Sequence, residues 1–313
     1  MKVLVTGASG FVGKAMLRRL SDEPACEVRA AVRRTDAEFP PGVAGTMVPS
    51  IGPNTQWREA LSDCDVVVHL AARVHIMREH SGDPLAEFRQ TNVQGTLTLA
   101  RQAALAGVRR FIHVSSIKVN GEATRAGQAF GADDRPMPVD PYAVSKLEAE
   151  AGLRRLGSTM EIVIVRPPLV YGPGVQGNFM TLMRAVSRCL PLPLGAVHNQ
   201  RSFVGLDNLV DFLLLCCRHP LAANQTFLVS DGHDLSTTEL VKRLARAMNK
   251  PALLMPLPAA WLMGAAALIG KSALAQRLCA NLQLDISKSR DLLGWTPLQS
   301  VDEALRDTAK CFR

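Results

Sequence analysis

A short apolar strand, a glycine-rich loop and a helical pattern follow one another at the start of this chain. Residues 2–6 read KVLVT, and the loop behind them places Gly7, Gly10 and Gly13 in the spacing Gly-x-x-Gly-x-x-Gly. Glycine lets the backbone turn tightly and lets a diphosphate approach closely, while the free amides at the start of the following helix balance the phosphate charge. The opening of the chain therefore predicts a dinucleotide-binding strand–loop–helix unit.

Further apolar runs alternate with helical patterns through the first two thirds of the chain. The strand candidates are residues 2–6, 27–32, 65–71, 110–116 and 161–167. Between them, residues 85–106 and 145–156 repeat apolar side chains at three- and four-residue spacing, as helices that cover a sheet do. The pattern predicts an α/β fold with a doubly wound parallel sheet of the Rossmann type, and it leaves the strand order open.

The composition of the sequence changes after Arg166, where prolines and glycines become frequent. Helical patterns follow near residues 179–188, 237–248 and 301–309. We therefore expect a dinucleotide-binding domain at residues 1–170 and a smaller C-terminal substrate-binding lobe at residues 171–313. Part of that lobe, about residues 200–220, is expected to return to the main domain.

The formal charge of +8 would suit nucleic acid, a membrane surface or a phosphorylated ligand. The basic residues are scattered, however, so we expect no nucleic-acid partner. The seven cysteines form no Cys-x-x-Cys pair, which indicates neither a metal site nor a disulfide framework. Cysteine usage favours a reducing compartment, and the first strand starts too early for a signal peptide. We therefore expect a cytoplasmic protein.

Residues 251–270 carry no charge over about the length that crosses a bilayer. Pro251, Pro256 and Pro258 break this stretch early and leave residues 259–270 too short to span. We expect a buried or partner-facing helix there and no integral membrane span. Peripheral association with a membrane stays open.

Several further motifs appear in order along the chain. They are HLAA at residues 69–72, TNVQGT around Asn92, VSS ending at Ser116, YAVSK from Tyr142 to Lys146, RPPLVYGPG from Arg166 and RSFVGLDN from Arg201. With the glycine loop, this ordered set resembles the extended branch of the short-chain dehydrogenase/reductase family. The resemblance implies an NAD(P)-dependent enzyme of the nucleotide-sugar epimerase, dehydratase and 4-ketoreductase group.

The predicted catalytic residues are Ser116, Tyr142 and Lys146. Tyr142 and Lys146 lie on one face of a helix, where an ammonium beside a phenol lowers the phenol pKa and permits proton exchange near neutral pH. In the family it resembles, Ser116 would hold the reacting oxygen of the substrate as hydride moves to or from the nicotinamide. Without that context, a tyrosine and a lysine four residues apart would be an ordinary surface pair.

The end of the second strand bears on the choice of cofactor. NAD binders usually place an acid there for the ribose hydroxyls, whereas this chain has Val32 followed by Arg33 and Arg34, which would meet a 2'-phosphate. NADPH or NADP is therefore favoured and NAD stays open, since the arginines could be solvated strand-end charges and Asp36 is close. The expected cofactor-binding residues are Gly7, Gly10, Phe11, Val12, Gly13, Arg33, Arg34, Ala71, Ala72, Tyr142, Lys146 and Pro168.

For the substrate, the resemblance implies a nucleotide-linked sugar whose diphosphate is held by Arg201, with Asn178 and Asp285 as weaker counterparts. Asn178 and Asp285 could instead cap neighbouring helices. Relatives often carry an adenine-contacting aspartate where this chain has Ser50, so adenine recognition stays open. The serine segment reads SSIKVNG and lacks the Thr-Asp-Glu of dehydratases, so dehydration is not expected.

Two reactions remain compatible with these motifs. We expect NADPH-dependent reduction of a UDP-linked 4-keto-6-deoxy sugar in surface-polysaccharide precursor synthesis, because the arginine pair suits NADPH. The alternative is a UDP-hexose or UDP-N-acetylhexosamine 4-epimerase that retains its NAD. A non-catalytic dinucleotide sensor is a third reading, which the intact Ser116, Tyr142 and Lys146 disfavour. The oligomeric state, including a homodimer, stays open.

Overall fold

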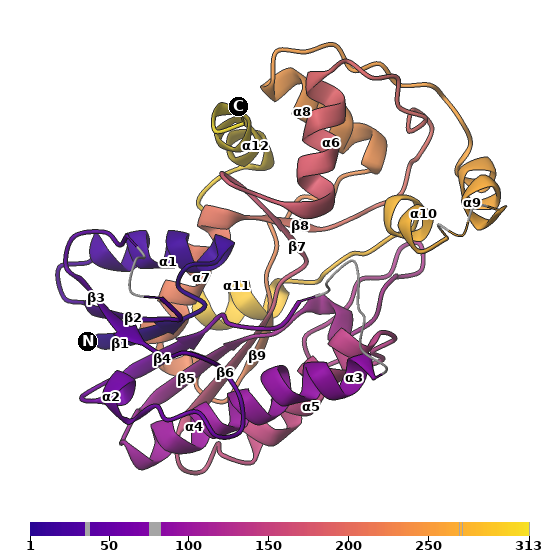
Figure 1. Ribbon diagram of the computed structural model, residues 1–313. Coiled ribbons are helices and arrows are strands. Elements are labelled where there is room, and N and C mark those ends of the chain that lie inside the picture. Colours follow the sequence, from indigo (N-terminus) through magenta and orange to yellow (C-terminus); the bar gives the residue numbers. More distant parts are fainter. Residues whose placement is uncertain (35–37, 75–82, 269, 271, 313) are drawn as a thin grey trace.

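The computed structural model describes residues 1–34, 38–74, 83–268, 270 and 272–312. Figure 1 shows a sheet with helices on both faces and a smaller lobe beyond one end of its strands. The seven strands are all parallel, in the order β3-β2-β1-β4-β5-β6-β9. They are β1 (Lys2–Thr6), β2 (Glu27–Val32), β3 (Val43–Met47), β4 (Val66–His69), β5 (Arg110–Val114), β6 (Glu161–Arg166) and β9 (Thr226–Leu228). The predicted doubly wound Rossmann fold is confirmed.

Helices cover both faces of the sheet. One face carries α1 (Phe11–Ser21), α7 (Leu206–Arg218) and α11 (Ser287–Leu293), and the other carries α2 (Arg58–Leu61), α4 (Thr96–Leu105) and α5 (Pro141–Arg154). Strand side chains alternate between the two faces. Val3 and Val5 accordingly belong to the core under α1 and α7, whereas Leu4 belongs to the core beside α4. The sheet is buried on both sides, which explains its nearly continuous apolar strands.

The predicted helix at residues 85–106 is one continuous helical stretch with an irregular middle. It runs through α3 (Pro84–Phe88), the π-helical segment η1 (Arg89–Gly95) and α4. A Cβ added to Gly95 would lie 2.7 Å from Cγ2 of Ile51, so only glycine lets the helix approach the chain after β3 this closely. Such π-helical turns are frequent at functional sites.

Two strands of the main sheet were not predicted from the sequence. β3 is an edge strand with three exposed residues, so its VAGTM sequence shows little apolar alternation. β9 has three residues and follows the proline-rich region after Arg166. Three predicted strands also run too far, since β4 ends at His69, β5 at Val114 and β6 at Arg166, where the backbone leaves the sheet.

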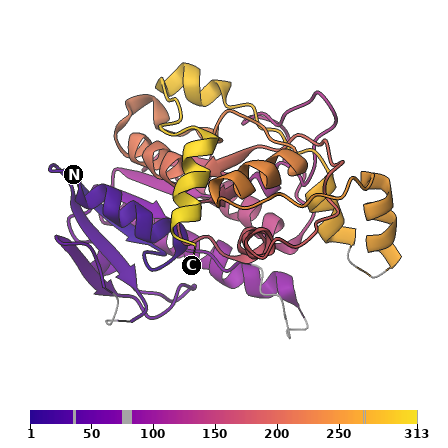
Figure 2. The same cartoon turned by 90° about the horizontal axis from the view of Figure 1, so that it is seen from above.

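The lobe is built around a third core. Its helices α6 (Gly177–Ser187), α8 (Thr237–Ala247) and α12 (Val301–Lys310) bury residues such as Phe179, Leu244 and Leu305 together. A two-stranded parallel sheet of β7 (Leu169–Tyr171) and β8 (Phe203–Gly205) joins the lobe to the main domain. Figures 1 and 2 show α9 (Ala259–Leu268) and α10 (Ser272–Cys279) at the outer edge of the molecule.

Residues 251–258, the first part of the uncharged stretch, form an extended segment that leads into α9. Among the described residues, no helix has the length and hydropathy to cross a membrane. Of the two expected alternatives, the buried helix is wrong, because α9 buries none of its residues, and the partner-facing helix stays a prediction. Most of its residues are exposed at the edge of the lobe, while Leu262 packs against the lobe core.

Candidate active site

The glycine loop joins the carboxyl end of β1 to α1, beside the point where the strand order reverses between β1 and β4. Gly7 has φ +67°, and a Cβ there would lie 2.7 Å from the amide nitrogen of Ala71. A Cβ on Gly13 would lie 2.1 Å from the carbonyl oxygen of Gly7. Both positions therefore require glycine, and the loop, free of side chains there, forms a cradle at the carboxyl end of β1.

The start of α1 leaves backbone amides available to an anion. Gly10 precedes the first turn in an extended conformation, no side chain caps the helix, and Phe11 and Val12 are its first two residues. Free amides at the positive end of a helix bind phosphate. The cradle, the uncapped helix and the small residues Ala71 and Ala72 after β4 therefore fit the diphosphate of a dinucleotide.

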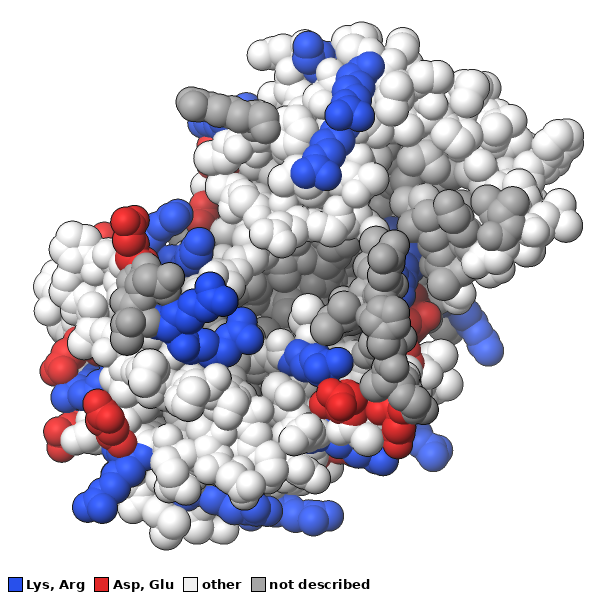
Figure 3. Space-filling view, viewed as in Figure 1, with Lys and Arg blue, Asp and Glu red and all other residues white. Residues whose placement is uncertain are grey.

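Arg33 and Arg34 follow the last residue of β2 directly, and both are exposed. Asp36, which the sequence raised as a competing acid, lies outside the described residues. Figure 3 shows a hollow between the end of the sheet and the lobe, with Lys and Arg side chains on its rim. Ser50 is exposed, and its carbonyl accepts a hydrogen bond of 3.0 Å from Oγ1 of Thr55.

The first turn of α5 holds Tyr142. Asp140 caps the helix, since its Oδ1 accepts from the Ala143 amide at 2.7 Å, and Pro141 occupies the first helical position. Tyr142 packs edge-on against Phe88, with ring centroids 6.0 Å apart. One turn later, Lys146 is buried and its Nζ donates to the carbonyl oxygen of Val114 at 2.8 Å. The helix thus places the tyrosine and the lysine on the side that faces the end of β5.

The pKa values of this pair depart from the expectation. Burial, and secondarily the Asp140 carboxylate, raises the pKa of Tyr142 to about 12. Burial lowers the pKa of Lys146 to about 8, with Glu150 opposing the shift. The predicted lowering of the phenol pKa by Lys146 is not seen in this structure, where burial raises that pKa and the lysine donates to Val114 instead.

Glu150 connects the elements that carry these residues. Its Oε1 accepts from Oγ of Ser115 at 2.6 Å and from Nε of Arg166 at 2.9 Å, and its Oε2 accepts from an Arg166 guanidinium nitrogen at 2.6 Å. Arg166 also donates to Oδ1 of Asn120 at 2.9 Å. This network links α5, β6 and the segment that contains Ser116. Sequence reasoning missed it, although a charged residue such as Arg166 at the end of an apolar strand was a usable signal.

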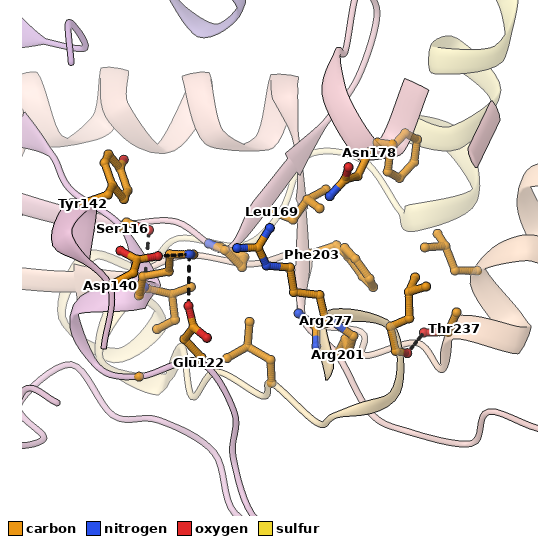
Figure 4. A pocket seen from close by; sticks show the side chains of 18 of the residues that line it. Ser116, Glu122, Asp140, Tyr142, Leu169, Asn178, Arg201, Phe203, Thr237 and Arg277 are labelled. Atoms are coloured by element: carbon orange, nitrogen blue, oxygen red, sulfur yellow. Dashed lines mark hydrogen bonds and ion pairs between the residues drawn. The ribbon is translucent and has the colours of Figure 1, made fainter. Parts of the chain in front are cut away.

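A cavity of about 420 Å³ lies between the end of the sheet and the lobe. Ser116, Tyr142, Pro168, Asn178 and Arg201 all line it, so the structure brings together predicted residues from both halves of the chain. Figure 4 shows Ser116 and Tyr142 at one end of this cavity, with Arg201 further along it. Its volume is in the range typical of small-molecule sites.

The two weaker substrate candidates fall in different places. Asn178 lines the cavity near the start of α6 and caps no helix, since the helix is preceded by Gln176. Asp285 does not line this cavity. Its Oδ1 accepts from the amide of Ser287, the first residue of α11, at 2.8 Å, although the N-cap position of that helix is Ile286, and it borders a separate cavity.

A second arginine, Arg277, lies near Arg201, and the sequence did not reveal it. Its backbone exchanges hydrogen bonds with Leu235, and its guanidinium donates to the Ala280 carbonyl oxygen at 2.8 Å. Burial, and then the nearby cation of Arg277 on α10, lowers the pKa of Arg201 to about 10. Arg277 lines the same cavity (Figure 4). Two guanidinium groups between mostly apolar walls suit a diphosphate.

Lys118 occupies the part of the cavity beside Ser116. Its Nζ forms ion pairs with Glu122, at 3.1 Å, and with Asp140, which Figure 4 draws as dashed lines from one ammonium to both carboxylates. The amide of Lys118 also donates to Oγ of Ser116 at 3.3 Å. The segment in which dehydratases carry two acids therefore presents a cation here.

No three His, Cys, Asp or Glu side chains gather into a metal-binding group within the part of the chain that the structure describes. The seven cysteines are free thiols.

Comparisons with known proteins agree with this geometry. The family model described as "NAD dependent epimerase/dehydratase family" matches residues 3–230. A Vibrio cholerae protein named UDP-glucose 4-epimerase is 45% identical over 313 residues, which cover 99% of this chain and 95% of that protein. The GDP-6-deoxy-D-mannose reductase of Pseudomonas aeruginosa is 28% identical over 255 residues, which cover 78% and 79%. The Bacillus cereus UDP-glucuronic acid 4-epimerase structure with NAD superposes with a TM-score of 0.80 at 23% identity, covering 100% and 98%.

Proposed function

Because the chain belongs to the NAD dependent epimerase/dehydratase family, we propose that it is a UDP-hexose or UDP-N-acetylhexosamine 4-epimerase that retains NAD. Family membership makes it an NAD(P)-dependent enzyme of the oxidoreductase type. The observation that carries the finer proposal is the 45% identity, over nearly its full length, to a protein named UDP-glucose 4-epimerase. That identity reverses the order expected from the motifs, which had placed a 4-ketoreductase first.

In this proposal, the Gly7–Gly13 loop and the start of α1 would hold the cofactor diphosphate. Lys146 would hold the nicotinamide ribose, and Ala71, Ala72 and Pro168 would border the dinucleotide. When bound, NAD would supply an acceptor for hydride from C4 of the sugar and a donor for its return.

Tyr142 and Ser116 act on the oxygen at C4 of the sugar. Ser116 donates a hydrogen bond to that oxygen while Tyr142 takes its proton and later gives it back. The high pKa of Tyr142 keeps the phenol protonated in the free protein, so it is a ready proton donor and a poor base until the site is filled. Lys146 fixes the end of β5 through Val114 and contributes a positive charge in a buried place.

The nucleotide-sugar diphosphate is assigned to Arg201 and Arg277, with Asn178 at the same wall of the cavity. Binding of the diphosphate at these residues would place the sugar near Ser116 and Tyr142. Epimerisation requires the 4-keto sugar to present both faces of C4 to one hydride donor. Mostly apolar walls, which hold a polar ring weakly, allow the sugar to turn while its diphosphate stays bound.

One observation favours a second candidate, the NADPH-dependent 4-ketoreductase. Arg33 and Arg34 at the end of β2 are exposed and stand where an NAD-binding acid is usual, so they suit a 2'-phosphate. A reductase that releases its cofactor after each turnover uses such a site.

Two parallel incubations distinguish these candidates. Purified protein is mixed with UDP-N-acetylglucosamine or UDP-glucose without added cofactor, and separately with a UDP-4-keto-6-deoxy-N-acetylhexosamine and NADPH. The proposal predicts the 4-epimer in the first mixture by NMR and no stoichiometric loss of reduced-cofactor absorbance in the second. NADPH consumption without epimer formation would replace it with the reductase.

A further inference from the structure

Helix α9 is apolar on every side and yet exposed. Its sequence is AAWLMGAAAL, which has no polar residue, and none of its residues is buried. Trp261 is 73% exposed and Leu268 is 89% exposed. A helix that is hydrophobic all round normally lies in a protein core or in lipid. Within this chain α9 packs along α10 and touches the lobe core through the half-buried Leu262, at the outer edge of the lobe (Figures 1 and 2).

The segment before α9 enlarges this surface. We call the set Leu253, Met255, Leu257, Trp261, Met263 and Leu268 the apolar edge, since each of these large hydrophobic side chains is exposed. The segment is fixed, because Leu192 exchanges backbone hydrogen bonds of 2.8 Å with Leu253 and Met255, and the Gly195 amide donates to Met255 at 2.9 Å. These side chains are therefore held outward, and exposed patches of this kind mark interaction sites.

The stretch of sequence that contains the apolar edge carries charge of a single sign. Residues 240–284 contain no Asp or Glu and contain Lys242, Arg243, Arg246, Lys250, Lys271 and Arg277. Lys242, Arg246 and Lys250 are exposed. Apart from Arg243, which pairs with Glu239 and Asp302, the described cations of this segment form no ion pair with the described carboxylates. An uncharged stretch set in a purely basic segment matches an anionic surface.

The charge of the surrounding sequence and the side chains on the exposed part of α9 favour lipid as its occupant. One side of α9 is already covered by α10 and by the contact of Leu262 with the lobe core, so an occupant would cover the remaining side, which carries Trp261 and Leu268. The boundary between lipid headgroups and acyl chains surrounds an apolar helix, and tryptophan is enriched there. At about 1.5 Å per residue, α9 is about 15 Å long, half of the roughly 30 Å hydrocarbon core, so it can enter one leaflet without spanning.

We propose that the apolar edge docks on the surface of a bilayer that contains anionic phospholipid, with α9 inserted at the headgroup boundary. α10 packs on α9 and carries Arg277 and Leu278 into the active-site cavity. Docking through α9 therefore holds that cavity close to the membrane surface.

Intrinsic fluorescence provides a direct test in the full-length protein. Trp57 is 0% and Trp295 is 3% exposed, so a shift in tryptophan emission on adding vesicles reports Trp261. We expect a blue shift and co-sedimentation with vesicles of equal phosphatidylglycerol and phosphatidylcholine, both weakened by salt. Absence of binding to these vesicles overturns the proposal.

Paired substitutions locate the contact. The double variant Trp261→Gln/Leu268→Gln should lower the vesicle-bound fraction by roughly tenfold or more and leave epimer formation in solution unchanged. The matched control is Leu105→Gln on α4, which also alters an 89% exposed leucine and should bind as the unaltered protein does. Equal vesicle binding by the double variant contradicts the proposal. The proposal is also contradicted if light scattering shows a dimer that vesicles leave intact and that the double substitution dissociates. A second copy of the chain would then cover the apolar edge.

Discussion

Glu150 and Arg166 form a bidentate ion pair in the interior of the protein, at 2.9 and 2.6 Å. Glu150 is on α5, one turn after Lys146, and Arg166 ends β6, so the pair joins the helix that carries Tyr142 and Lys146 to the carboxyl end of β6. Ser115, the neighbour of Ser116, donates to the same carboxylate. Glu150, which does not line the cavity, therefore helps to set the relative position of Ser116 and α5.

Glu150→Gln is expected to destabilise the protein by about 3–5 kcal/mol, because it leaves Arg166 buried with its charge uncompensated. Chemical denaturation followed by circular dichroism measures this loss. Glu148→Gln on the same helix is the control, since its ion pair with Arg89 lies at the surface and should contribute little. Equal effects of the two substitutions would show that the buried pair has no special role.

Tyr142→Phe should reduce turnover by about 10²–10⁴-fold, because it removes the group that exchanges the proton with the sugar oxygen. Cofactor binding, followed by calorimetry, should persist. The chain has one other tyrosine, Tyr171, whose hydroxyl donates to Asp231 at 2.7 Å inside the lobe. Tyr171→Phe should keep its turnover and lose some stability. A Tyr142→Phe variant that works at the rate of the unaltered enzyme would remove the tyrosine from the mechanism.

Lys146 makes stability depend on pH. Burial lowers its pKa from 10.5 to about 8, so between these values the unfolded chain holds a proton that the folded protein has released. The contribution of Lys146 to the free energy of unfolding therefore rises with pH between about 8 and 10.5. Below pH 8 the cost of burying the ammonium is fully present. Relative to Lys146→Met, the free energy of unfolding should increase by about 2 kcal/mol from pH 7.5 to pH 10. A constant difference between the two proteins would contradict the shifted pKa.

Arg33→Asp should shift cofactor preference toward NAD, because a carboxylate at the end of β2 repels a 2'-phosphate and binds ribose hydroxyls. The ratio of NADP to NAD affinity, measured by calorimetry, should fall roughly tenfold or more. Arg101→Asp on α4 makes the same charge change at another exposed position and should leave that ratio unchanged. If Arg33→Asp also leaves it unchanged, the strand-end arginines are only solvated charges.

The local sequence was sufficient to predict those parts of the site that lie within one turn or loop of the chain. The glycine loop, the start of α5 at Pro141 and the strands around them follow from steric and capping rules that act over a few residues. Contacts between distant segments were not readable. Arg277 reaches the cavity only because α10 packs there, and Asp285 satisfies a local helix end instead.

The sequence favoured the 4-ketoreductase over the 4-epimerase for a similar reason. Ser116, Tyr142 and Lys146 serve proton and hydride transfer in either reaction, so their motifs carry no information on whether hydride returns to the same sugar. The pKa of Tyr142 also escaped prediction, because burial depends on how the lobe, Phe88 and α5 enclose the phenol.

A 4-epimerase that retains its NAD returns the hydride taken from C4 to the same sugar. The most direct measurement uses UDP-N-acetylglucosamine or UDP-glucose carrying deuterium at C4, with excess unlabelled cofactor in solution. We expect a 4-epimer that retains the deuterium at C4, seen by mass spectrometry and NMR, with none in the free cofactor. Deuterium in the free cofactor, or no 4-epimer from either sugar, would contradict it.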